Sequence, residues 1–357
     1  MPLVIHNTTE ISPEWLTAVL RRSGTLRTGA VRGCQARTGQ ATWSHNAIIL
    51  PEYTPGASGD LPLTLFLKLV NATAFVATSE VHYFTRDYVD LPNAPIPCCY
   101  DAQVDLDSGA YHILMEDLSA THRNNHGVPP TGSYGIHLAW ALAALHDHRW
   151  GEARWQGFDG ALPTGDVIER YVAAARPGLE PLLADVQGEI PTEWETALRQ
   201  TFEHHPRLML ERTHDPVGFT LIHGDPNPGN ILSPREGEGK VYLVDRQPFD
   251  WSLTTWLGVS DLAYAIIPWW DTETRRRWEM PILREYYSQL TRRGVKDYGW
   301  EQLMLDYRLS VVQTLYIPTE WCSTEEGRTK MRWVWRPELD RIMTAFFDLR
   351  CAELWAA

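Results

Sequence analysis

The chain has 357 residues, of which 44% are hydrophobic and 22% charged, so it is long enough for two domains and apolar enough for a sizeable core. Its formal net charge of -13 argues against a nucleic-acid surface, which needs clustered Lys and Arg. With no apolar run near the ~20 residues of a membrane-spanning helix, and with five cysteines that show no metal-ligand spacing, we expect a cytoplasmic protein without a membrane partner.

The first third of the chain is predicted to form mainly strands and turns. Residues 41–50 (ATWSHNAIIL) and 63–70 (LTLFLKLV) are strand-like, and a segment rich in Pro, Gly and Asp separates them. Residues 73–89 then show the 3.6-residue spacing of an amphipathic helix. Residues 110–118 (AYHILMEDL) follow as a buried strand, which ends in a polar loop.

The rest of the chain is predicted to be mostly helical. Residues 133–150 give a strong helix pattern with Ser133 as a candidate N-cap. Further helices are expected at about 166–186 and 193–213, and strands within 218–225 and 240–245.

Strands followed by helices predict the α+β class with two lobes. We place a β-rich lobe at residues 1–117 and a helix-rich lobe at residues 118–357.

The segment LIHGDPNPGNIL holds the clearest chemical motif. A predicted strand leads into His223 and Asp225, Asn230 follows five residues later, and a second strand ends at Asp245. Carboxylate and carboxamide oxygens suit Mg²⁺. Phosphoryl transfer needs such a metal together with a carboxylate that orients the attacking hydroxyl.

The pattern H-G-D-x-x-x-x-N, then a short hairpin and LVDRQP, resembles the aminoglycoside phosphotransferase and choline kinase-like families, and the ecdysteroid-kinase-like branch is also similar. The resemblance implies a protein-kinase-like fold, with Asp225 as the catalytic base and Asn230 and Asp245 as Mg²⁺ ligands. It also implies that Asp261, in SDLAYAI, braces the catalytic loop. Arg246 departs from the pattern, since relatives usually carry an aromatic residue there.

Parts of an ATP site are expected in the N-terminal lobe. Lys68 stands among apolar residues in a strand, where an unpaired ammonium is costly, and Glu80 in the next helix is its natural partner. In a kinase, this pair positions the ATP phosphates. Gly39 is the candidate for a phosphate-covering loop, although an ordinary hairpin turn explains it equally well.

The segment ILMEDL resembles the hinge between the lobes of these kinases. The resemblance implies that backbone groups of Glu116, Asp117 or Leu118 bind adenine.

The leading interpretation is an ATP- and Mg²⁺-dependent kinase that phosphorylates a hydroxyl group of a small molecule. The segments PWWD and TEWCSTEEG combine aromatic and acidic residues, which would suit a cationic acceptor such as an amine. One alternative is a catalytically silent protein that binds nucleotide. Another is a metal-dependent hydrolase using His223, Asp225 and Asn230, which lacks the His-rich ligands of such sites.

Overall fold

The computed structural model describes residues 4–40, 44–71, 78–151, 161–247 and 252–355. These residues form two compact units. The first unit runs to Arg123, whereas the sequence analysis placed the boundary between the lobes after Asp117. The second contains Asn124–Gln247 and the described residues after Trp251.

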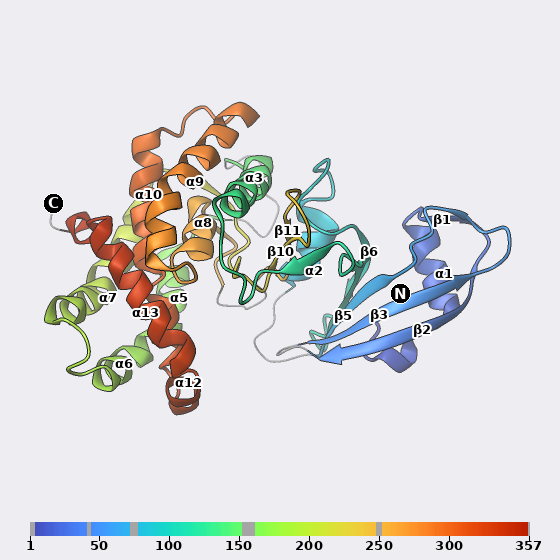
Figure 1. Ribbon diagram of the computed structural model, residues 1–357, viewed down its shortest axis with the longest axis horizontal. Helices are drawn as coiled ribbons and strands as arrows, with labels where there is room; N and C mark the ends of the chain where they lie inside the picture. Colours follow the sequence, from blue (N-terminus) through green and yellow to red (C-terminus); the bar gives the residue numbers. More distant parts are fainter. Residues whose placement is uncertain (1–3, 41–43, 72–77, 152–160, 248–251, 356–357) are drawn as a thin grey trace. The chain divides into compact units, whose positions relative to one another are not determined.

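The first unit combines antiparallel strands with a few short helices (Figure 1). A five-stranded sheet has the order β2-β3-β5-β7-β6, and β1 pairs separately with β4. The elements are η1 (Thr8–Glu10), α1 (Pro13–Arg22), β1 (Leu26–Thr28), β2 (Val31–Gln40), β3 (His45–Tyr53), β4 (Ser58–Gly59), β5 (Leu65–Val70), α2 (Ser79–His82), η2 (Tyr83–Asp87), β6 (Cys99–Val104) and β7 (Tyr111–Glu116). The short strand β8 (His122–Asn124) crosses the division between the units.

Helix α1 packs on the five-stranded sheet and builds the core of the first unit. Ser12 begins the helix as its N-cap, because its hydroxyl accepts a hydrogen bond from Trp15 N at 3.1 Å. Leu16, Val19 and Leu20 are fully buried, and each contributes about 1.5–3 kcal/mol of hydrophobic stabilisation. On the sheet side the same core contains Ala47, Ile49, Leu65, Leu67, Leu69 and Leu114.

The helix predicted over 73–89 is helical in its described part. Residues 72–77, including Phe75, lie outside the described residues. Ser79–His82 form one α-turn, and Tyr83–Asp87 continue as a π-helical turn. Val81 and Phe84 are buried, as one apolar face of an amphipathic helix requires.

The second unit is predominantly helical and also contains short antiparallel strand pairs (Figure 1). Strand β9 pairs antiparallel with β12, and β10 pairs with β11 as a hairpin. Its elements are α3 (Gly132–His148), α5 (Gly165–Ala175), η3 (Arg176–Gly178), α6 (Leu179–Asp185), α7 (Thr192–Arg212), β9 (Phe219–Leu221), β10 (Ile231–Pro234), β11 (Tyr242–Leu243), β12 (Thr255–Leu257), α8 (Val259–Ile266), α9 (Thr272–Arg293), α10 (Trp300–Gln313), α11 (Tyr316–Trp321), α12 (Glu325–Lys330), α13 (Arg332–Asp348) and η4 (Cys351–Leu354).

Helix α3 begins earlier than predicted. Thr131, not Ser133, is its N-cap: the Thr131 hydroxyl accepts from Tyr134 N at 3.2 Å. Ser133 lies inside the first turn and instead donates to Glu238 at 2.7 Å. The N-cap prediction was therefore wrong by two residues, because Ser and Thr suit this position equally and only the backbone conformation separates them.

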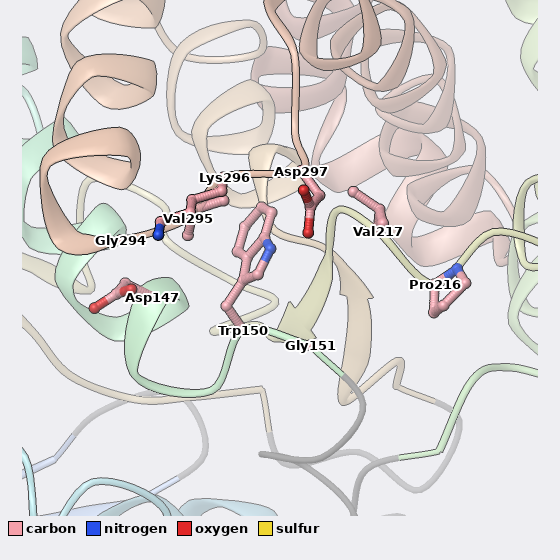
Figure 2. Close-up of a pocket in the computed structure, with 9 residues that line it drawn as sticks. All are labelled: Asp147, Trp150, Gly151, Pro216, Val217, Gly294, Val295, Lys296 and Asp297. Carbon is pink, nitrogen blue, oxygen red and sulfur yellow. The ribbon is translucent and has the colours of Figure 1, made fainter.

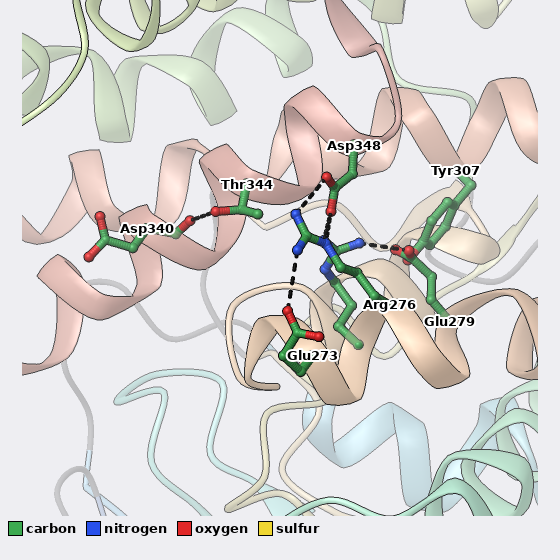
Figure 3. Close-up of polar contacts among 8 residues, drawn as sticks. Glu273, Arg276, Glu279, Tyr307, Asp340, Thr344 and Asp348 are labelled. Carbon is green, nitrogen blue, oxygen red and sulfur yellow. Dashed lines mark hydrogen bonds and ion pairs between the residues drawn. The ribbon is translucent and has the colours of Figure 1, made fainter.

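Polar contacts, exposed at Arg276 and buried at Glu279, join the helices α9, α10 and α13. Arg276 on α9 makes two hydrogen bonds to Asp348 at the end of α13, at 2.8 and 2.9 Å (Figure 3). Tyr307 on α10 donates to Glu279 on α9 at 2.8 Å, and Arg275 pairs with the same carboxylate. Because an unpaired buried charge is costly, the buried pair of Arg275 and Glu279 and its hydrogen bond from Tyr307 help to fix how α9 and α10 pack.

Among the described helices, none combines the length and the hydropathy that crossing a bilayer requires.

Candidate active site

The loop after β9 is held by a carboxylate from α8. Asp261 accepts hydrogen bonds from His223 N at 2.6 Å and from Gly224 N at 2.8 Å. His146 on α3 contacts the same carboxylate at 3.0 Å. Two backbone donors and a histidine thus fix the loop conformation immediately before Asp225.

His223 is a structural member of this loop. Its Nδ1 accepts from Asp225 N at 3.3 Å, so its Nε2–H donates to Val244 O at 2.9 Å. Burial lowers the pKa of His223 to about 4. The imidazole is therefore neutral at pH 7 and links the loop of Asp225 to the strand that precedes Asp245.

The Asp225 carboxylate is oriented by three side chains. Asn227 donates to Oδ1 at 2.9 Å, Asn230 donates to Oδ2 at 3.0 Å, and the Tyr264 hydroxyl also bonds to the carboxylate. Burial raises the pKa of Asp225 from 3.8 to about 6, and the nearby Asp245 adds to this rise while the three hydrogen bonds oppose it. A fixed carboxylate with a pKa near the working pH has the properties of a general base.

Asn230 and Asp245 lie on adjacent loops, because Val244 N donates to Asn230 O at 3.0 Å. The amide nitrogen of Asn230 donates to Asp225, which leaves its amide oxygen available to a metal ion; the role of Asn230 as a metal ligand stays a prediction. Asp245 has φ 59°, a left-handed conformation that is uncommon for a residue other than glycine and concentrates at functional sites.

These oxygen donors fit Mg²⁺. Among the residues that the structure describes, no group of three His, Cys, Asp or Glu side chains could hold a metal alone. Mg²⁺ instead uses one or two protein carboxylates together with substrate phosphates, and so a sparse protein ligand set is expected.

Arg246 replaces the expected aromatic residue without leaving the interior. Its side chain is 2% exposed, and its Nε donates to Ile222 O at 3.1 Å. The guanidinium therefore ties the loop of Asp245 to the segment that precedes His223.

The first unit brings Lys68 and Glu80 together. Lys68 Nζ on β5 lies 2.7 Å from Glu80 Oε1 on α2, and Tyr111 on β7 donates to the other oxygen of Glu80. Glu80 is fully buried and Lys68 nearly so. Their role in binding phosphates stays a prediction.

The other residues predicted to contact the nucleotide are Gly39, Glu116 and Leu118. Gly39 lies in β2, paired with Asn46, rather than in a loop, and residues 41–43 lie outside the described residues. Glu116 ends β7, and its N–H already donates to Cys98 O at 2.8 Å. Leu118 is buried two residues later. Adenine binding by these residues stays a prediction.

A small cavity of about 30 Å³ adjoins the loop of Asp225. It lies between Gly224, Tyr264 on α8 and Ile317 on α11, and its other lining residues include some from α5, α8 and α10. Sequence analysis had not identified Asn227 or Tyr264 as partners of Asp225. Asn227 lies inside the catalytic motif, so its closeness to Asp225 could have been predicted from the sequence. No sequence pattern distinguishes Tyr264 from other residues of its helix.

A larger pocket of about 310 Å³ lies elsewhere in the second unit (Figure 2). Trp150, after α3, stands in it beside Val295 and Lys296 of the loop between α9 and α10. None of Asp225, Asn230 and Asp245 lines it, so it is separate from the predicted catalytic residues.

The fold and these motifs agree with comparisons to known proteins. The model of the APH phosphotransferase enzyme family matches residues 59–301, more than half of the chain. The chain belongs to this phosphotransferase family. The matched region includes Lys68, Glu80 and the whole segment from His223 to Asp261.

Solved structures of kinases share the fold across nearly the whole chain. A choline kinase from Cryptosporidium parvum has a TM-score of 0.58 at 10% identity, covering 96% of this chain and 98% of its own. A spectinomycin phosphotransferase, solved with ADP and spectinomycin, has a TM-score of 0.51 at 13% identity, covering 97% and 98%. No curated protein matches this chain in sequence. The phosphotransferase has the kinase-like α+β fold predicted from its sequence.

Proposed function

We propose that the protein transfers a phosphoryl group from ATP to a hydroxyl group of a small molecule in a Mg²⁺-dependent reaction. The observation that carries the proposal is the Asp225 carboxylate, fixed by Asn227, Asn230 and Tyr264 next to the loop of Asp245. Family membership supports phosphoryl transfer as the reaction class.

In this proposal Asp225 orients the acceptor hydroxyl and takes its proton while the new O–P bond forms. The bond between the γ-phosphorus and the β,γ-bridging oxygen of ATP breaks in the same transfer, and ADP leaves. Asn230 and Asp245 hold Mg²⁺, which when bound neutralises the phosphate charge. Asp261 and His223 keep the loop in the geometry that the reaction needs.

The first unit is proposed to bind ATP. Lys68, oriented by Glu80, contacts the phosphates, and the segment that contains Gly39 covers them. Backbone groups of Glu116 and Leu118 hold the adenine ring. The Lys68 ammonium is buried and paired with Glu80. Because burying a charge inside a strand is costly, its presence there supports a role in binding phosphates.

The acceptor is proposed to be a small and cationic molecule, phosphorylated in the cytoplasm. The net charge of -13 favours cations in general, and the acidic side chain of Glu320, which senses the charge of Asp225, favours them locally. The five cysteines are all free thiols, as in proteins of a reducing compartment.

Thermal unfolding with ATP tests the metal-dependent part of the proposal. We expect Mg²⁺ to increase the protection that ATP gives, and Asp245→Ala to remove that increase. Asp297→Ala, which changes an exposed carboxylate in the separate pocket, is the matched control and should leave the increase intact. ATP protection that does not depend on Mg²⁺, without turnover of any acceptor, would favour the catalytically silent nucleotide-binding alternative.

A further inference from the structure

Arg246 places a buried charge directly after Asp245, the proposed Mg²⁺ ligand. Its side chain is 2% exposed. A buried guanidinium is costly unless oxygens accept its N–H groups, because it cannot lose its charge. The contacts that hold Arg246 inside the protein therefore also act on the main chain beside Asp245.

Backbone oxygens at the end of the β9–β12 pair receive the guanidinium. Ile222 N donates to Thr254 O at 3.0 Å, so the pairing of the two strands continues one residue beyond β9. The carbonyl oxygen of Ile222 accepts from Arg246 Nε at 3.1 Å, and Arg246 Nη2 lies 3.5 Å from Thr254 O, at the outer limit of a hydrogen bond. An apolar side chain at position 246 would donate to neither oxygen.

The main chain on both sides of Asp245 is held as well. Val244 O accepts from His223 Nε2 at 2.9 Å, and Gln247 N donates to His223 O at 3.1 Å. Asp245, between these contacts, has φ 59°, and such a conformation persists in a residue other than glycine only where the surroundings enforce it. Of the contacts that enforce it, the one from Arg246 comes from a side chain of this loop, so a substitution can remove it alone.

We propose that Arg246 is a positioning residue for Mg²⁺, and that its hydrogen bond to Ile222 O keeps Asp245 in the conformation that presents the carboxylate to the metal. The inference rests on the proposed function, because it takes Asp245 as a Mg²⁺ ligand. The acceptors of Arg246 belong to the protein backbone, so its hydrogen bonds need neither metal nor nucleotide. A ligand that is already in place loses less conformational freedom when the metal binds, and the metal binds more tightly for that reason.

Calorimetric titration with ATP at 25 °C, with and without Mg²⁺, tests this role. The measured quantity is the Mg²⁺ gain, defined as the ratio of the Kd for ATP without Mg²⁺ to the Kd with saturating Mg²⁺. No acceptor and no turnover are needed.

Two variants and one control are compared with the wild type. Arg246→Met removes the donors, and Arg246→Lys keeps the charge on a flexible stem. Arg275→Met is the matched control, because Arg275 is 1% exposed and its acidic partners, Glu279 and Asp348, belong to α9 and to the end of α13. It loses buried ion pairs that lie outside the loop of Asp245.

We expect Arg246→Met to reduce the Mg²⁺ gain about tenfold, the effect of one charge-assisted hydrogen bond, while the Kd for ATP without Mg²⁺ changes less than about twofold. Arg246→Lys should reduce the gain less, about threefold, because an ammonium can donate to Ile222 O but lacks the planar fork of a guanidinium. Arg275→Met should keep the whole gain although it lowers the unfolding midpoint, since a merely structural loss does not change how the metal is held.

An unchanged Mg²⁺ gain in Arg246→Met would overturn the inference, and so would an equal loss in Arg275→Met. If Arg246→Met does not fold, Arg246→Lys decides: a reduced gain supports the positioning role, and a gain equal to that of the wild type overturns it. A wild type whose ATP affinity does not respond to Mg²⁺ would refute the proposed function and this inference together. A response that is lost in Asp245→Ala but kept in Arg246→Met would refute this inference alone.

Discussion

Asp225→Asn should stabilise the folded protein at neutral pH while it removes catalysis. The pKa of Asp225 is about 6 in the folded state against 3.8 for an ordinary aspartate. A folded pKa above the unfolded one means that stability is present at low pH and is lost as pH rises through this window. The difference of about 2.2 units corresponds to about 3 kcal/mol of lost stability at pH 7.

The net gain should be smaller than this value. An asparagine presents one oxygen and one NH₂ group to Asn227 and Asn230, which both donate to the carboxylate in the wild type. One of these hydrogen bonds must therefore rearrange, at a cost of about 1 kcal/mol. We expect a net gain of about 1–2 kcal/mol at pH 7, which raises the unfolding midpoint by about 2–8 °C.

Thermal unfolding at pH 7 and at pH 4 measures this effect. At pH 4 the folded wild type is protonated at Asp225, so the advantage of the variant should almost vanish or change sign. A gain in stability of equal size at both pH values, or a variant less stable than the wild type at pH 7, would refute the reasoning that burial destabilises the charged form of Asp225.

Three further predictions concern neighbouring residues. Tyr264→Phe removes a hydrogen bond that lowers the pKa of Asp225, so the acidic limb of the kcat/KM profile should move to higher pH; an unmoved limb would separate Tyr264 from the base. Gly224→Ala should lower the free energy of unfolding by about 1–3 kcal/mol, because Gly224 has φ 83° and an added Cβ would lie 2.9 Å from Gln247 Oε1. Gly299→Ala, at an open position, is its control and should cost less than about 1 kcal/mol in chemical denaturation. Lys68→Met should raise KM for ATP by about 10- to 100-fold, since it removes a charged contact to phosphate, and an unchanged KM would leave Lys68 with a structural role only.

Local spacing predicted the parts of the site that lie close together in the chain. His223, Asp225 and Asn230 stand within eight residues, so one loop had to present them together. The partnership of Lys68 with Glu80 was also predictable, because a buried ammonium needs a nearby acid and the next helix supplies one. The same reasoning gave the α+β class, since strand and helix periodicities differ.

Long-range packing determined what the sequence could not predict. Whether Arg246 lies inside or outside could not be predicted, because its burial depends on how the ends of β9 and β12 lie beside the loop of Asp245. Tyr264 reaches Asp225 only because Asp261, one turn earlier on α8, anchors the loop. The position of Gly39 inside β2 depends on strand register, which a single glycine does not fix.

Phosphate transfer by Asp225→Asn tests the central claim most directly. ATP consumption is measured against a panel of hydroxylated acceptors, amines included, for the wild type and for the variant, and ATP affinity is measured in parallel. The account predicts that the variant loses transfer by at least about a thousandfold while its Kd for Mg²⁺–ATP changes little. Unchanged turnover in Asp225→Asn would contradict the assignment of Asp225 as the catalytic base.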